Sequence, residues 1–147
     1  MRITRAGICD LEKVTPLFDA YRVFYLQNSD LAGAHIFLEA RMTRKESVIF
    51  IAVNDAQKAV GFIQLYPSFS SVSLAPVWTL NDLFVVPEAR GKGVATHLMN
   101  KAKDFALSQS AKGIQLETSR ENNIAQNLYE SLGYLKSSDT HYYFLPL

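Results

Sequence analysis

The spacing of apolar residues along the first third of the chain predicts two helices. Over 10–25, apolar positions recur every three or four residues, as expected for a helix with one buried face. Pro16 falls inside this stretch and is poorly tolerated within a helix. We therefore expect the regular helix to begin at Thr15 as its cap, with Pro16 in the first turn. A second helix is expected over about 29–44, with Ser29 as its N-cap.

Continuous runs of β-branched, aromatic and aliphatic residues predict strands in the middle of the chain. The third run ends at Pro87, because proline cannot donate a hydrogen bond to a strand ladder. Later, a stretch with helical spacing runs up to Gly133, a residue type common just after a helix. The expected strands are 2–6, 47–53, 60–67, 77–86, 114–118, 134–137 and 141–145, and the later helices are 93–110 and 123–133.

This order of elements predicts a mixed α/β fold in a single domain over 1–147. The strand–helix–strand unit formed by 77–86, 93–110 and 114–118 makes its two strands parallel if they are neighbours. We therefore expect a central, twisted, mixed β-sheet flanked by about four helices.

Composition and charge exclude several classes of partner. The 15 basic and 14 acidic residues leave a net charge of +1, so direct binding to nucleic acid is not expected. No apolar run approaches the roughly 20 residues of a membrane span. The N-terminus lacks an apolar core of signal-peptide length. Cys9 is the single cysteine, so no intrachain disulfide can form. We expect a cytoplasmic protein without a membrane partner, and without a metal because its three histidines are scattered.

The segment "RGKGVA", residues 90–95, concentrates glycine and positive charge between a predicted strand and a predicted helix. The first amides of a helix lack partners inside the helix, and glycines let a ligand approach the backbone closely. With Arg90 and Lys92, these amides predict a site for an anion, most often a phosphate. The alternative is a tight β–α turn without a ligand. The P-loop pattern is absent, and Thr96 stands where a dinucleotide-binding loop would carry its third glycine.

Two motifs give the chain a resemblance to a known family. Arg90, Gly93 and Ala95 match the Arg/Gln-x-x-Gly-x-Gly/Ala loop of the GNAT superfamily of N-acetyltransferases. A second motif of that family, N-x-x-A-x-x-L-Y-x-x-x-G-F/Y, is matched by Asn122, Ala125, Leu128, Tyr129, Gly133 and Tyr134. The order of elements agrees as well. The resemblance therefore spans nearly the whole chain and implies the GNAT acyl-CoA N-acyltransferase fold.

The resemblance implies acetyl-CoA as co-substrate and no metal. In the family, the glycine loop grips the pyrophosphate, and the pantetheine arm lies along the strand that precedes the loop. Asn122 would reach the arm from the other side, and the alternative for this residue is an N-cap of the following helix. The residues expected at the cofactor are Leu83, Phe84, Val85, Arg90, Gly91, Lys92, Gly93, Val94, Ala95, Thr96, Asn122 and Ala125.

The resemblance also implies catalytic roles. Tyr129 occupies the family position that often protonates the departing thiolate, and the alternative is a tyrosine packed in the core. A backbone amide at Leu83 or Phe84 is expected to bind the oxyanion. Some members carry a pair of acids just before this strand segment, and here the pair reads Asn81 and Asp82. Asn81 cannot take a proton. Asp82 remains a candidate base or amine ligand, or else a satisfied carboxylate at a strand bulge.

Aromatic residues are expected to line the site of the acceptor, with Tyr21 and Tyr25 on one helical face and Trp78 near the adjoining loop. Packing of the helix on the sheet is the alternative. The reaction implied is direct attack, in a ternary complex, by a primary amine of a small molecule, polyamine, protein or peptide. A noncatalytic acyl-CoA sensor and an unrelated nucleotide-binding protein are the other functions that stay open. The last predicted strand could pair two chains as a homodimer.

Overall fold

The computed structural model describes all 147 residues, Met1–Leu147. The chain forms two compact units, 1–117 and 118–147, which are described separately. The elements of the first unit are β1 (Arg2–Arg5), η1 (Ile8–Asp10), α1 (Leu11–Phe24), α2 (Leu31–Thr43), β2 (Val48–Val53), β3 (Ala59–Ser70), β4 (Ala75–Val85), η2 (Pro87–Ala89), α3 (Val94–Ser108) and β5 (Gly113–Gln115), and the second unit contains α4 (Asn123–Ser131).

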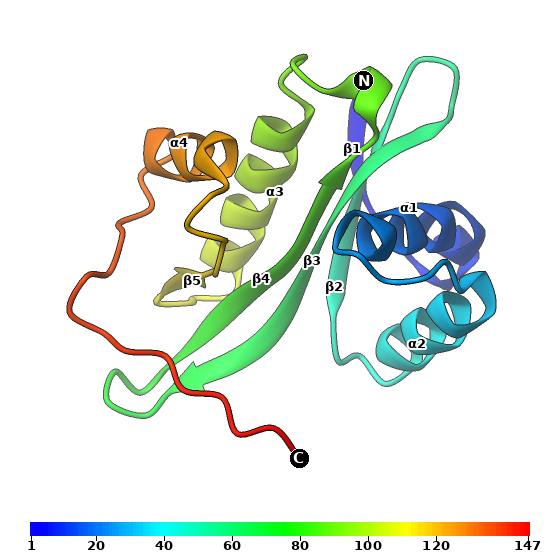
Figure 1. Ribbon diagram of the computed structural model, residues 1–147. Helices are drawn as coiled ribbons and strands as arrows, with labels where there is room; N and C mark the ends of the chain where they lie inside the picture. Colours follow the sequence, from blue (N-terminus) through cyan, green and yellow to red (C-terminus); the bar gives the residue numbers. More distant parts are fainter. The chain divides into compact units, whose positions relative to one another are not determined.

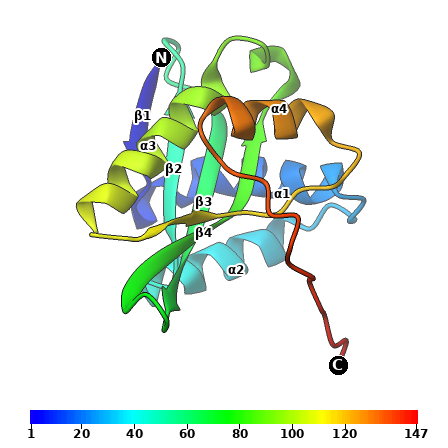
Figure 2. The same cartoon turned by 90° about the vertical axis from the view of Figure 1, so that its left-hand side faces the viewer.

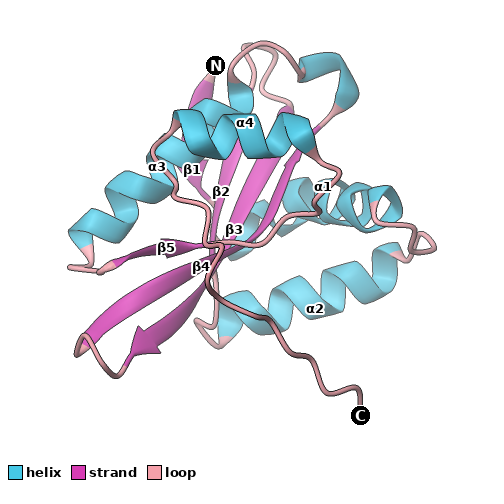
Figure 3. Ribbon diagram, turned by 60° about the vertical axis from the view of Figure 1, so that its left-hand side comes forward, coloured by secondary structure: helices cyan, strands magenta, loops and turns pink.

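The first unit is built on a five-stranded sheet in the order β1-β2-β3-β4-β5. Neighbouring strands are antiparallel except for β4 and β5, which are parallel because α3 returns the chain to the same end of the sheet. Helices α1 and α2 cover one face, and α3 covers the other (Figures 1 and 2). Figure 3 shows how short β5 is beside β4. The predicted mixed α/β fold is confirmed.

Helix α1 begins at Leu11, and the predicted start at Thr15 is wrong. The Thr15 hydroxyl donates to the Leu11 carbonyl oxygen (2.8 Å), one turn back, and Pro16 lies exposed within the helix. Leu11 and Val14 are both buried in the core beneath α1. Burial of two such side chains is worth about 1.5–3 kcal/mol each, enough to offset the hydrogen bond that Pro16 removes.

Helix α2 is capped by Asp30, and the predicted cap Ser29 has another role. The Asp30 carboxylate accepts a hydrogen bond from the Gly33 amide (2.8 Å), so the helix starts at Leu31. The Ser29 hydroxyl instead donates to the buried Asp19 carboxylate (2.7 Å). The loop between α1 and α2 is thereby tied to α1.

Strand β4 contains a bulge at Asn81. Gln64 of β3 is opposite Asp82, but the next β3 residue, Leu65, is opposite Leu80. Asn81 is therefore an extra residue without a partner on β3. Because side chains alternate along a strand, the bulge moves every residue before it to the other face of the sheet.

The second unit contains α4 followed by a segment without regular secondary structure. The predicted strands 134–137 and 141–145 are absent. Their aromatic and aliphatic residues favour strands locally, but a strand persists only when paired, and no ladder includes them. No helix of the chain is long and apolar enough to cross a membrane.

Candidate active site

The loop between β4 and α3 presents a row of unpaired backbone amides. Gly91 and Gly93 adopt left-handed backbone, with φ of 70° and 78°, a conformation that glycine takes without a steric penalty. Gly93 caps α3, and its carbonyl oxygen accepts from the His97 amide (3.1 Å). No backbone hydrogen bond within the chain engages the amides of residues 91–96. Six consecutive N–H groups at a helix N-terminus form a site suited to an anion.

The two basic side chains of this loop have no acidic partner. The Arg90 Nε donates to the Val85 carbonyl oxygen (2.8 Å), and the guanidinium lies 5.6 Å from the centre of the Phe84 ring. The Lys92 ammonium donates to the Glu88 carbonyl oxygen (2.9 Å). Neither side chain forms an ion pair. Their charges therefore remain available to a bound anion.

The last part of β4 has an open edge. The Val86 amide donates to Val60 of β3 (3.0 Å), so alternation directs the N–H and C=O groups of Phe84 toward β3 as well. Those of Leu83 and Val85 point to the opposite side. Strand β5 pairs only with Val77 to Thr79 and leaves this edge uncovered. The open edge thus lies directly before the loop of free amides.

A polar cluster, consisting of Tyr21, Gln64, Asn81 and Asp82, holds the bulge; Gln64 and Asp82 are buried, Tyr21 is half-buried and Asn81 is exposed. The side-chain amides of Gln64 and Asn81 both donate to the Asp82 carboxylate, the Asn81 contact at 3.0 Å. The Tyr21 hydroxyl donates to the Asn81 carbonyl oxygen (3.2 Å). Gln64 is 0% exposed and Asp82 is 2% exposed. The Asp82 carboxylate is thus satisfied by hydrogen bonds at a strand bulge, which is the alternative named for it above, and its role as a base stays a prediction.

Burial governs the proton affinity of this cluster. Burial raises the pKa of Asp82, and the hydrogen bonds from Gln64 and Asn81, with the nearby Tyr21 hydroxyl, oppose that rise only in part. Burial, together with the nearby Asp82 charge, raises the pKa of Tyr21 far above its ordinary value. Tyr66 of β3 behaves in the same way. Both tyrosines therefore remain neutral hydrogen-bond donors at any physiological pH.

The structure brings together only part of the aromatic set expected around the acceptor. The Tyr21 and Tyr25 rings are 4.9 Å apart, and Tyr21 reaches the bulge. Trp78 instead packs on Phe105 of α3, with ring centres 4.9 Å apart, on the face of the sheet that α3 covers. The bulge at Asn81 causes this separation. Sequence reasoning missed Gln64, although a lone polar residue within a buried apolar strand is the signal that could have revealed it.

In the second unit, the expected cofactor residue Asn122 is the N-cap of α4. Its side-chain oxygen accepts from the Ala125 amide (3.2 Å), which confirms the capping alternative. Tyr129 lies about two turns after Asn122 along α4, and its ring centre is 6.0 Å from that of Tyr134. Burial raises the pKa of Tyr134 to about 12, and the neighbouring Tyr129 adds to the rise.

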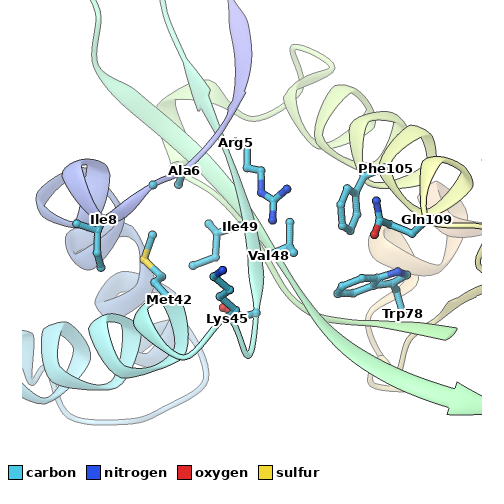
Figure 4. Close-up of a pocket in the computed structure, with 12 residues that line it drawn as sticks. Arg5, Ala6, Ile8, Met42, Lys45, Val48, Ile49, Trp78, Phe105 and Gln109 are labelled. Atoms are coloured by element: carbon cyan, nitrogen blue, oxygen red, sulfur yellow. The ribbon is translucent and has the colours of Figure 1, made fainter. Parts of the chain in front are cut away.

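A separate hollow opens at the edge of the sheet where β1 ends (Figure 4). Its volume is about 440 Å³, and its walls include Arg5, Lys45, Trp78 and Phe105. Arg5 lies over the Phe105 ring at 5.3 Å, so aromatic packing already uses its guanidinium. None of the residues of the glycine loop or the bulge cluster lines it. This hollow is therefore distinct from the site described above. No group of three or more His, Cys, Asp or Glu side chains is placed to hold a metal ion.

Comparison with known proteins agrees with this geometry. Residues 14–134 match the model of the acetyltransferase (GNAT) family. An uncharacterized N-acetyltransferase of Bacillus subtilis, YhfO, is 47% identical over 145 residues, which cover 99% of this chain and 97% of that protein. The crystal structure of a probable acetyltransferase superposes with a TM-score of 0.95 at 44% identity and covers 100% of this chain and 98% of that one.

A more distant structure shares the fold. It is an aminoglycoside N-acetyltransferase solved in complex with CoA, with a TM-score of 0.82 at 22% identity over 99% of this chain and 95% of that one. The family match and the whole-length relatives indicate the same family, and the free amides and the open strand edge are consistent with it. The chain belongs to the GNAT family of N-acetyltransferases.

Proposed function

We propose that this protein transfers an acetyl group from acetyl-CoA to a primary amine. The observation that carries the proposal is the run of six unpaired amides at residues 91–96, beside two cationic side chains, Arg90 and Lys92, that have no acidic partner. A pyrophosphate group offers the oxygens that such a run of N–H groups binds best. The distantly related aminoglycoside acetyltransferase, which was solved with CoA, supports the same cofactor.

The pantetheine arm would lie along the open edge of β4. Its amide groups can exchange hydrogen bonds with the backbone of Leu83 and with the Val85 amide, which point away from β3; the Val85 carbonyl oxygen already accepts from the Arg90 Nε (2.8 Å). This geometry favours Leu83 over Phe84 as the donor to the oxyanion, because the Phe84 amide faces β3. Asn122 remains proposed as a second contact to the arm, in addition to capping α4.

In the proposed reaction, the amine nitrogen attacks the thioester carbonyl carbon and forms a tetrahedral oxyanion. Collapse of this intermediate breaks the C–S bond and releases the CoA thiolate. Tyr129 is proposed to give the thiolate its proton, because the pKa of a phenol, near ~10, is close enough to that of a thiol, near ~8.5, for the transfer to occur; the phenolate then regains a proton from water. The excess proton of the amine leaves through water, either to solvent or to Asp82, because Asn81 cannot accept it and Asp82 is buried.

A thiol-release assay tests the proposal. Acetyl-CoA is mixed with polyamines, lysine peptides, peptide N-termini, amino acids and aminoglycosides in turn. Saturable release of free CoA with one class, and an acetylated product found by mass spectrometry, is the expected result. Tight CoA binding without turnover on any amine would contradict the enzyme and favour a sensor.

The remaining properties are proposals with their own measurements. Light scattering behind a sizing column would test the homodimer. Fractionation of the host cell would test the cytoplasmic location. A single cooperative unfolding transition would support one domain over 1–147.

A further inference from the structure

The β4 bulge is a feature that a sheet does not maintain by itself. Asn81 has no partner on β3. The pairing between β3 and β4 could shift by one residue on either side of Asn81 and so move the bulge to another position. Such a shift would turn every side chain beyond it to the other face. Leu83 follows two residues after Asn81, so the direction of its amide depends on where the bulge sits.

Three side-chain hydrogen bonds fix the bulge in place. Gln64 and Asn81 converge on the two oxygens of Asp82, and Tyr21 binds the Asn81 carbonyl oxygen (3.2 Å). Gln64 is the member on the neighbouring strand, directly opposite Asp82. It alone joins the bulge to the regular part of the sheet through a side chain.

Stability alone does not account for a glutamine at this position. Phe62, which lies on the same face of β3 as Gln64, is fully buried. The residues before and after Gln64 along the strand, Ile63 and Leu65, are buried as well. An apolar pair at 64 and 82 of similar volume would stabilise the fold at least as well as a buried polar pair. The Gln64 side-chain oxygen also has no partner. The polar pair therefore fixes a geometry at some cost in stability.

We propose that Gln64 is a positioning residue for acetyl transfer. It holds Asp82, and through Asp82 the bulge at Asn81, so that the Leu83 amide faces the open edge of β4. The role rests on the proposed function, in which that amide binds the oxyanion. Gln64 touches neither cofactor nor amine, and it acts only through the backbone of β4.

The first test removes the glutamine amide. In Gln64→Leu we expect kcat to fall about 10–100-fold, the scale of a displacement of about 1 Å at a reacting centre. The Kd for CoA should stay within about threefold, because the loop amides at 91–96 are untouched. Gln115→Leu is the matched control. It removes a hydrogen bond to Thr79 of β4 (3.0 Å) without touching the bulge, and it should keep kcat.

A second variant adds a pH signature that a structural role would not give. Gln64→Glu places two carboxyl groups side by side, and they can share one proton. As pH rises and that proton is lost, the two charges repel and the bulge is released. We therefore expect kcat of Gln64→Glu to fall with rising pH relative to the wild type. The same fall would be absent in Gln115→Glu.

Amide NMR resonances report the bulge without turnover. In Gln64→Leu the Asn81 and Leu83 resonances should shift, while Gln115→Leu leaves them in place. Unshifted resonances, wild-type kcat in a folded Gln64→Leu, or a parallel loss of CoA affinity would each overturn the positioning role. A wild-type protein that acetylates no amine would contradict the proposed function but not the structural role of Gln64. In that case, shifted Asn81 and Leu83 resonances in Gln64→Leu would still show that Gln64 fixes the bulge.

Discussion

Charge at Gly93 should control CoA binding, and the chain offers a closely matched pair of variants to test this. Gly93 has a φ of 78°, a region that asparagine and aspartate tolerate better than other non-glycine residues. An added Cβ would lie 3.6 Å from the His97 ring, an ordinary contact. Gly93→Asn and Gly93→Asp therefore impose similar strain and bulk, and they differ by one negative charge.

The size of the effect follows from Coulomb's law. Two unit charges about 6 Å apart repel by about 0.7 kcal/mol in water and by about 3 kcal/mol at the effective dielectric of a protein surface. A pyrophosphate carries about two charges, which doubles these limits to about 1.4 and about 5.5 kcal/mol, and we expect a difference between the variants of roughly 3 kcal/mol, within that range. This corresponds to about a hundredfold weaker binding of CoA by Gly93→Asp than by Gly93→Asn.

Calorimetric titration with CoA at low and high salt measures this difference. The Debye length falls from about 10 Å at 0.1 M salt to about 3 Å at 1 M, so the gap between the variants should narrow strongly at high salt. Equal affinities for Gly93→Asn and Gly93→Asp at low salt would refute the phosphate site at this loop. A gap that does not respond to salt would refute its electrostatic origin.

Three further predictions concern other parts of the chain. Tyr129→Phe should lower the turnover number at least about tenfold with CoA affinity kept within a few fold, and unchanged turnover in the thiol-release assay would return this ring to a packing role. Ser29→Ala should cost about 1–2 kcal/mol in urea unfolding near pH 7, because hydrogen bonds from Ser29 and the Asp30 amide lower the pKa of Asp19. This contribution is present above the unfolded pKa and is lost as pH falls through the lower folded pKa, so wild type and variant should converge in acid. Pro16→Ala should stabilise the protein by about 1–2 kcal/mol, since an exposed proline inside α1 lacks the amide that a helix requires, and equal urea midpoints would contradict this.

The sequence predicted most elements because their apolar spacing and their burial agree. The six buried residues of β2 and the inner faces of α1 and α3 follow directly from the pattern. Helix starts were less predictable. Proline disfavours a helix interior, but the burial of Leu11 in the core stabilises a helix that begins before Pro16. The choice between Ser29 and Asp30 as cap depended on Asp19, which lies ten residues earlier in the chain.

The bulge explains the largest gap between sequence and site. Trp78 and Asp82 are four residues apart, and regular alternation would place both on one face of the sheet. One inserted residue at Asn81 separates them; the family resemblance raised a bulge at Asp82 as an alternative, but no residue type along β4 signals it. The glycine loop was predictable because its chemistry is local: two glycines, two cations and a helix start lie within a few residues. The Gln64–Asp82 pair joins positions 18 residues apart and became visible only in the folded chain.

The open edge of β4 also bears on the solubility of the protein. A strand that offers unpaired N–H and C=O groups is a template for any extended segment, including one from another copy of the same chain. Globular proteins usually blunt such edges with charges, prolines or a covering element. Here Leu83 and Val85 are both apolar, Pro76 lies at the far end of β4, and the next proline is Pro87, beyond the strand. A cofactor bound along this edge would thus serve as the missing neighbour and guard the protein against intermolecular strand addition and aggregation.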